Sequence, residues 1–177
     1  DILVLPLFQD VNKAPNNALA GLSRTQRSLV NEALASESFT GKAGKRLSVW
    51  TAGCQVVLVG MGQDPSDKAC RDGGAKTLAA LSKDHGTNLT VRFTTGWTTS
   101  KMALFAEGMV LRDYSFDKYQ QKDEEEDQDD WSLNCQASAR HQSELTTAVA
   151  KSVAVASGVH IARELGNEPA NVMYPEE

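Results

Sequence analysis

The sequence predicts an α/β fold, a three-layer α/β/α sandwich built on a mixed, largely parallel sheet. Short runs of strand-forming residues alternate along the chain with stretches of helical apolar spacing, which is typical of helices packed on a sheet. One run, Val56 to Val59, is apolar at every position, so both of its faces should be covered by helices. With 177 residues and 41% hydrophobic content, the chain is long enough to bury the core of one such domain.

The first predicted strand is Ile2 to Phe8, a short run of apolar strand formers. Pro6 stands inside this run and cannot donate a hydrogen bond to a neighbouring strand. We therefore expect this strand to lie at an edge of the sheet or to end early.

The first predicted helix begins after Ser23 and runs to about Ser36. Ser23 and Gln26 have the spacing of a capping box, in which each side chain accepts a hydrogen bond from the backbone amide of the other residue. The apolar residues expected on its buried face are Leu29, Val30, Ala33 and Leu34.

Four further strands are expected, at Leu47 to Thr51, Gln55 to Val59, Leu89 to Thr94 and Trp131 to Cys135. The second of these contains the fully apolar run and should lie inside the sheet.

Two helices are expected among these strands. One starts after a capping Ser66 and runs to about Lys83, and the pair Gly73-Gly74 within it indicates close backbone packing, because glycine in a helix costs about 1 kcal/mol relative to alanine. The other runs from Ser100 to about Asp113. Its inward face should carry Met102, Phe105, Ala106 and Met109.

The last predicted helix is long and apolar and covers Glu144 to about Leu165. We interpret residues 1–166 as one α/β domain and residues 167–177, called the strap below, as a connection to a further domain. The residues expected to fix the path of the strap are Asn167, Pro169, Asn171 and Pro175.

Composition excludes several classes of protein. The net charge is −5, but Lys122 to Asp130 alone contributes −6, so the remainder is at +1 and offers no basic face for nucleic acid. No run of 18 apolar residues is present, so we expect no membrane span, and no secretory leader is expected at the start of the chain. The chain has three widely spaced cysteines, Cys54, Cys70 and Cys135, and this pattern argues against a disulfide framework and a zinc site. It favours a cytoplasmic location, or an organelle after removal of a transit peptide.

The turn after the fully apolar strand is a candidate for ligand binding. Gly60-Met61-Gly62 is similar to the start of a dinucleotide-binding loop, but Pro65 stands where the third glycine would be. We therefore interpret it as a tight strand-to-helix turn. Backbone amides near Ser66 offer a weaker alternative, an anion site formed by Gly60, Gly62 and Ser66.

Other polar patterns do not predict a catalytic or metal-binding residue. His160 and Glu164 are one helical turn apart, but two ligands do not make a metal site, and we expect them to be packed or hydrogen-bonded. The acidic run Lys122 to Asp130 is interpreted as a solvated loop, with a docking strip for a basic partner as the alternative.

Four segments, taken in order, agree in sequence and interval with one protein family. They are F-T-G-K-A-G at Phe39 to Gly44, V-V-L-V-G-M-G at Val56 to Gly62, F-A-E-G-M-V-L-R-D-Y-S-F-D-K-Y at Phe105 to Tyr119, and G-V-H-I-A-R-E-L-G-N-E-P-A-N-V-M-Y-P at Gly158 to Pro175. Together they resemble the N-terminal domain of the leucyl aminopeptidases, the cytosol aminopeptidase family. The last segment is the most specific, because these residues fall at the family's spacing: Ala162, Arg163, Asn167, Pro169, Ala170, Asn171 and Pro175.

The resemblance implies a macro-domain-like N-terminal domain joined by the strap to a C-terminal peptidase domain. That second domain is expected to hold two divalent metals, zinc or manganese, and to remove N-terminal residues such as leucine from peptides with a metal-bound water. The resemblance also implies a hexamer. None of the peptidase domain's metal ligands or catalytic residues matches a residue here, so the expected role is non-catalytic: supporting the assembly and shaping access to the peptidase sites.

Two other functions stay open on the sequence alone. A macro-like module could bind ADP-ribose or another phosphate ligand at the turn after Val59. A free-standing structural subunit without a peptidase half would show the same residues.

Overall fold

The computed structural model describes residues 1–10, 14–37, 39–81, 88–116, 118–119 and 131–172. Within these residues, strands and helices alternate as the sequence predicts, and the α/β class is confirmed. The elements are β1 (Ile2–Leu7), α1 (Arg24–Ser36), β2 (Arg46–Thr51), β3 (Cys54–Gly60), α2 (Asp67–Leu81), β4 (Asn88–Arg92), α3 (Thr99–Asp113), β5 (Ser132–Gln136) and α4 (Ala139–Asn167).

The strands form one mixed sheet in the order β2-β3-β1-β4-β5. β1 pairs in parallel with β3 and with β4, and β4 pairs in parallel with β5. β2 pairs with β3 in the antiparallel direction. The sheet is therefore largely parallel, with an antiparallel strand at one edge.

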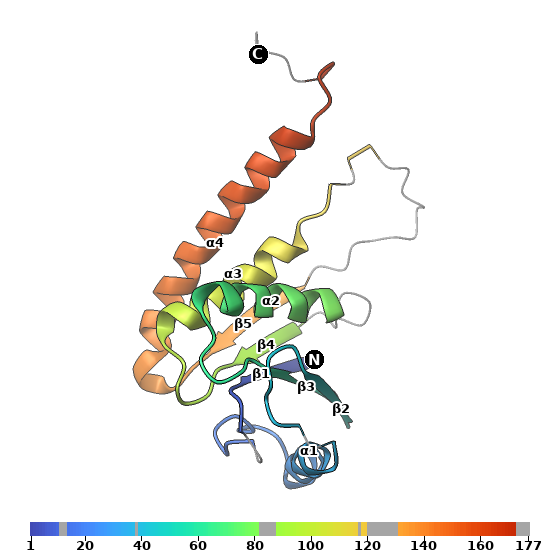
Figure 1. The fold of residues 1–177 in the computed structure, drawn as a ribbon, viewed down its shortest axis with the longest axis vertical. Coiled ribbons are helices and arrows are strands. Elements are labelled where there is room, and N and C mark those ends of the chain that lie inside the picture. Colours follow the sequence, from blue (N-terminus) through green and yellow to red (C-terminus); the bar gives the residue numbers. More distant parts are fainter. Residues whose placement is uncertain (11–13, 38, 82–87, 117, 120–130, 173–177) are drawn as a thin grey trace.

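Helices cover both faces of this sheet, with α1 on one side and α2, α3 and α4 on the other (Figure 1). Side chains of β1 alternate between the two cores. Leu3, Leu5 and Leu7 pack in the same cluster as the buried residues of α1. Ile2 and Val4 pack in the cluster that contains the buried residues of α2 and α3. The three-layer sandwich is thus built on strands that are apolar on both faces.

The expectation that Pro6 places its strand at an edge or ends it early is wrong. β1 is the central strand, and Pro6 is paired in register with Val59 of β3. Pairing with β4 ends at Val4, and the carbonyl of Pro6 on that side accepts a hydrogen bond from Trp97 Nε1 at 3.2 Å. Because the N–H and C=O of one strand residue point to the same side, the missing amide of Pro6 falls where no strand needs it.

The capping box of α1 is confirmed, but only two of the four residues of its predicted buried face are buried. Gln26 N donates to Ser23 Oγ at 3.2 Å, and Ser23 N donates to Gln26 Oε1 at 2.8 Å. Val30 and Leu34 are buried, whereas Ala33 is half-buried and Leu29 is 41% exposed. Val30 and Leu34 are one turn apart and make a narrow contact with the sheet, and Leu29 lies about 100° around the helix from Val30.

α4 is longer than the sequence predicts, since it begins at Ala139 and ends at Asn167. Part of α4 packs on α3, and the rest projects beyond the sheet (Figure 1). By length and composition alone, α4 could also cross a membrane: its most apolar window has a mean hydropathy of 1.3, and only 11% of that window is buried. The sequence predicts no membrane span, because it contains no uninterrupted run of 18 apolar residues. α4 reaches a mean hydropathy of 1.3 in that window without such a run.

α2 and α3 cross with their backbones in contact. A Cβ atom added at Gly74 would lie 1.9 Å from the carbonyl oxygen of Phe105, and one added at Gly108 would lie 1.9 Å from the carbonyl oxygen of Arg71. Arg71 Nε also donates to the buried carboxylate of Glu107 at 2.7 Å across the same crossing. The close backbone packing predicted from Gly73-Gly74 is therefore present, and Gly74 is the residue that requires it.

Replacing Gly74 by alanine should destabilise the protein, whereas Gly73→Ala should not. The new methyl group at Gly74 meets the rigid backbone of α3, so we expect the free energy of unfolding to fall by about 1–3 kcal/mol despite the better helix propensity of alanine. At Gly73 the nearest atom is the mobile end of Met61, and the change should stay within about 1 kcal/mol. Urea denaturation of the two variants measures both values. Equal midpoints would contradict this account of the crossing.

Candidate functional site

The turn after β3 places Gly60 and Gly62 in close contact with the chain that precedes β2. Gly60 N donates to the carbonyl of Lys45 at 2.8 Å, and Gly62 N donates to the carbonyl of Gly41 at 2.9 Å. A Cβ atom at Gly60 would lie 2.1 Å from the carbonyl oxygen of Lys42. These glycines therefore permit a close approach of two backbone segments, and both amides are already hydrogen-bonded. The hypothesis of an anion at this turn stays a prediction, but neither amide is free to bind one.

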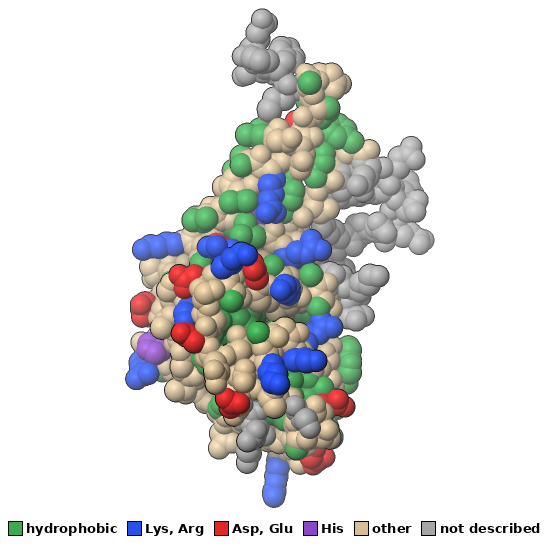
Figure 2. Space-filling model, in the orientation of Figure 1, with side chains coloured by type: hydrophobic (Ala, Val, Ile, Leu, Met, Phe, Trp, Pro, Cys, Tyr) green, Lys and Arg blue, Asp and Glu red, His purple; other side chains and the backbone are tan. Residues whose placement is uncertain are grey.

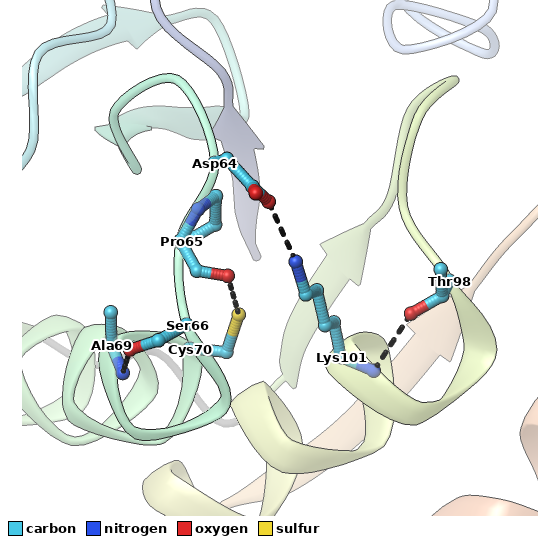
Figure 3. A network of polar contacts seen from close by, with 7 residues as sticks. All are labelled: Asp64, Pro65, Ser66, Ala69, Cys70, Thr98 and Lys101. Atoms are coloured by element: carbon cyan, nitrogen blue, oxygen red, sulfur yellow. Dashed lines mark hydrogen bonds and ion pairs between the residues drawn. The ribbon is translucent and has the colours of Figure 1, made fainter.

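The third candidate, Ser66, is the N-cap of α2 (Figure 3). Its Oγ accepts a hydrogen bond from Ala69 N at 3.2 Å. Beside it, Lys101 Nζ of α3 donates to Asp64 Oδ1 at 2.9 Å, and this bond raises the pKa of Lys101. The Ser66 hydroxyl and the Lys101 ammonium group thus tie the turn to α2 and α3.

A groove of about 380 Å³ lies between the segment before β2, the end of β3 and α2. Gly60 is the only one of the three anion candidates in its lining. Three exposed cations and one carboxylate also line it, namely Lys45, Arg46, Lys76 and Asp72. An anion in this groove would meet side-chain cations rather than glycine amides.

Two of the three cysteines are held as thiols by burial. All three are free. Burial raises the pKa of Cys70 and raises that of Cys135 to about 12, so both remain protonated thiols near neutral pH. Within the described ranges, no group of three or more His, Cys, Asp or Glu side chains is placed to hold a metal ion.

His160 and Glu164, the pair weighed as metal ligands, both contact Tyr114. The imidazole packs on the phenol ring with centroids 5.3 Å apart, and Tyr114 Oη donates to Glu164 Oε2 at 3.2 Å. Arg163 lies over the same ring, with its guanidinium carbon 5.6 Å from the centroid. Asn167 Nδ2 donates to Tyr114 Oη at 3.1 Å, so the first residue of the strap joins this group. Tyr114 thus holds the end of α4 against the segment that follows α3.

Glu168, the first residue after α4, is fixed by two side chains from the segment after α3. Its carboxylate forms an ion pair with Lys118 and accepts a hydrogen bond from Tyr119 Oη at 2.5 Å. The Glu168 side chain is only 5% exposed. The bonds from Lys118 and Tyr119 lower the pKa of Glu168. We call Lys118, Tyr119 and Glu168 the clasp.

Beyond the clasp, the strap makes a turn. Val172 N donates to the carbonyl of Pro169 at 2.9 Å, and Asn171 is exposed within this turn. Pro175 and the acidic run at 122–130 lie outside the described residues. Of the four residues predicted to fix the strap's path, Asn167 and Pro169 make described contacts, and the sequence reasoning missed Glu168.

Comparison with known proteins now adds to this geometry. The model of the cytosol aminopeptidase family, N-terminal domain, matches residues 4–123, which is more than half of the chain. The chain belongs to the cytosol aminopeptidase family. The matched residues show that the chain contains the N-terminal domain of that family.

Relatives in the cytosol aminopeptidase family are much longer than this chain. A probable cytosol aminopeptidase of Methylorubrum populi is 34% identical over 165 residues, which cover 88% of this chain and 32% of the relative. One from a Cyanothece strain is 29% identical over 184 residues, covering 99% of this chain and 36% of the relative. The chain therefore spans about a third of the length of the relatives it matches.

Solved structures share the fold of this cytosol aminopeptidase domain. A mutant of tomato leucine aminopeptidase superposes with a TM-score of 0.75 at 23% identity, covering 99% of this chain and 37% of the other. The bottromycin maturation enzyme BotP in complex with Mn superposes with a TM-score of 0.68 at 19% identity, covering 99% and 34%. Both cover β5 and α4, which follow the last residue matched by the family model.

The pKa of Glu168 tests the clasp directly. Because a lowered pKa stabilises the fold above the ordinary value of 4.5, this contribution is complete above that pH and lost as the pH falls through the lowered pKa. We expect an NMR titration of the Glu168 carboxylate to give a pKa below 4.5. Lys118→Met should move it up towards 4.5 and leave carboxylates remote from the clasp unchanged. The same Glu168 pKa in both proteins would show that the ion pair does not form.

Proposed function

We propose that this chain is the non-catalytic N-terminal domain of a cytosol aminopeptidase. Its role is to hold a C-terminal peptidase domain in a fixed direction, to support the oligomer and to shape access to the peptidase sites. Membership of the family and the coverage of about a third of each relative support the presence of such a second domain. A hexamer and a cytoplasmic location complete the proposal, the latter supported by three free cysteines.

The observation that carries the proposal is the clasp. A connection that only linked two independent domains would not need a carboxylate held by two side chains directly after α4. Here Glu168 is held by Lys118 and Tyr119, and the preceding turn of α4 is held by Tyr114 through Glu164 and Asn167. The polypeptide therefore leaves this domain in one direction, which is what a positioning domain requires.

The chemistry belongs to the C-terminal part. Two divalent metals bound there, zinc or manganese, would polarise the scissile carbonyl and supply a metal-bound water as nucleophile. BotP, which has the same fold in this region, was solved with Mn. Since the described residues contain no set of metal ligands, we assign the metals to the C-terminal domain and no catalytic step to this chain.

An aminopeptidase assay tests this proposal. The full-length protein should hydrolyse a leucine amide substrate in the presence of Mn²⁺, and the purified chain of residues 1–177 should not. Turnover by residues 1–177, free of contaminating peptidase, would overturn the non-catalytic role. A full-length protein that is inactive with both Mn²⁺ and Zn²⁺ would overturn the aminopeptidase assignment.

A further inference from the structure

The projecting half of α4 presents an apolar face that contacts nothing in the described structure. Exposed fractions reach 57% at Val155, 62% at Ile161 and 50% at Leu165. Residues 152–162 contain no charged side chain. Figure 2 shows hydrophobic side chains gathered along this projecting part of the molecule. An apolar surface of this kind on a helix end indicates a covering partner.

Small residues occur at every fourth position of this face: Ala150, Ala154, Gly158, Ala162 and Gly166. Residues four apart lie one above the other on a helix, so these form a single smooth line along α4. We call this line, with the exposed Val155, Ile161 and Leu165, the outer face of α4. A Cβ atom added at Gly158 or at Gly166 would meet nothing within 4 Å.

The crossing of α2 and α3 shows what helical glycines do in this protein. Gly74 and Gly108 each allow a backbone carbonyl of the other helix to approach where a Cβ atom would stand. Gly158 and Gly166 are less favourable in a helix than alanine, and neither makes any such contact in the described residues. The outer face of α4 therefore has the form of one half of a close helix crossing.

We propose that the outer face of α4 is the docking surface for an α-helix of the C-terminal peptidase domain, which crosses α4 at Gly158 with the two backbones in contact. This inference rests on the proposed function, because it needs the second domain. The line of small residues sets the crossing point, and Val155, Ile161 and Leu165 supply the apolar flanks that the docked helix covers.

The position of the strap argues for this occupant. The family model is that of the N-terminal domain, so the additional two thirds of each relative follow it. Gly158 lies nine residues before Asn167, or about 14 Å along the helix axis. The clasp fixes the polypeptide at the end of α4, so a domain that begins there is at high effective concentration beside the outer face.

The opposite side of α4 argues against a lipid bilayer. Leu145, Ser152 and Ala156 of α4 are buried, so one side of the helix is already packed on protein. In the projecting half, Arg163 donates a hydrogen bond to the carbonyl of Leu111 in α3, and Glu164 accepts one from Tyr114, the residue after α3. A bilayer around this half would have to take in both charged groups, which is costly.

A single substitution tests the docking, because it should change the melting temperature in opposite directions in the chain of residues 1–177 and in the full-length protein. In the chain of residues 1–177, Gly158→Leu should leave the melting temperature unchanged or raise it, because the site is open and leucine favours helix. In the full-length protein the same leucine would separate the two helices. We expect the melting temperature to fall by several degrees and the strap to be cleaved faster by a protease. Gly158→Ala should show both effects more weakly.

Thr147→Leu is the matched control, since it adds a leucine at an exposed position of α4 that is outside the row of small residues and eleven residues before Gly158, and both melting temperatures should stay near wild type. Gly158→Leu with no effect on either protein would overturn the docking surface. The choice of occupant would be overturned if residues 1–177 formed a dimer in sedimentation, or bound phosphatidylglycerol vesicles, and Gly158→Leu abolished that association. If the docking fails while wild-type full-length protein is an active aminopeptidase, the proposed function stands. An inactive wild-type enzyme would instead count against the function itself.

Discussion

The complete burial of two neighbouring parallel strands is the constraint on which the structure depends. β1 and β3 are apolar along almost their whole length and nearly every residue in them is buried, so both faces of the sheet need a helical layer. On one face, α2 and α3 provide this layer side by side, and Gly74 and Gly108 allow their backbones to meet. The same demand puts β1 at the centre, despite Pro6, and leaves β2 and β5 at the edges.

α4 completes one core and is left with a second face that has no partner in the described residues. Its inner residues extend the core beneath α3, and its last turns are fixed by Tyr114 and by the clasp. Its outer face has an apolar surface and open glycines. A helix that is rigidly held on one side and uncovered on the other suits a link between two domains. The family model ends at residue 123, yet β5 lies after that residue and pairs with β4, so β5 belongs physically to this sheet.

Local signals in the sequence predict most of the fold, because their physical cause lies in neighbouring residues. The capping box of Ser23 and Gln26 and the all-apolar strand Val56 to Val59 are of this kind. The edge position predicted from Pro6 is wrong, because the effect of this proline depends on where β4 stops pairing with β1. It also depends on Trp97, which is remote in sequence. The clasp could not be predicted, since Lys118 and Glu168 are 50 positions apart and an isolated ion pair leaves no periodic pattern.

Hydrogen exchange along α4 tests the central claim, that this domain holds a second domain through the uncovered face of its last helix. The amides of residues 152–166 should exchange markedly more slowly in the full-length protein than in the chain of residues 1–177, because a docked helix suppresses local opening. The amides at the crossing of α2 and α3 should exchange at the same rate in both proteins. Equal exchange along α4 in the two proteins would show that its outer face stays uncovered, and would contradict the account.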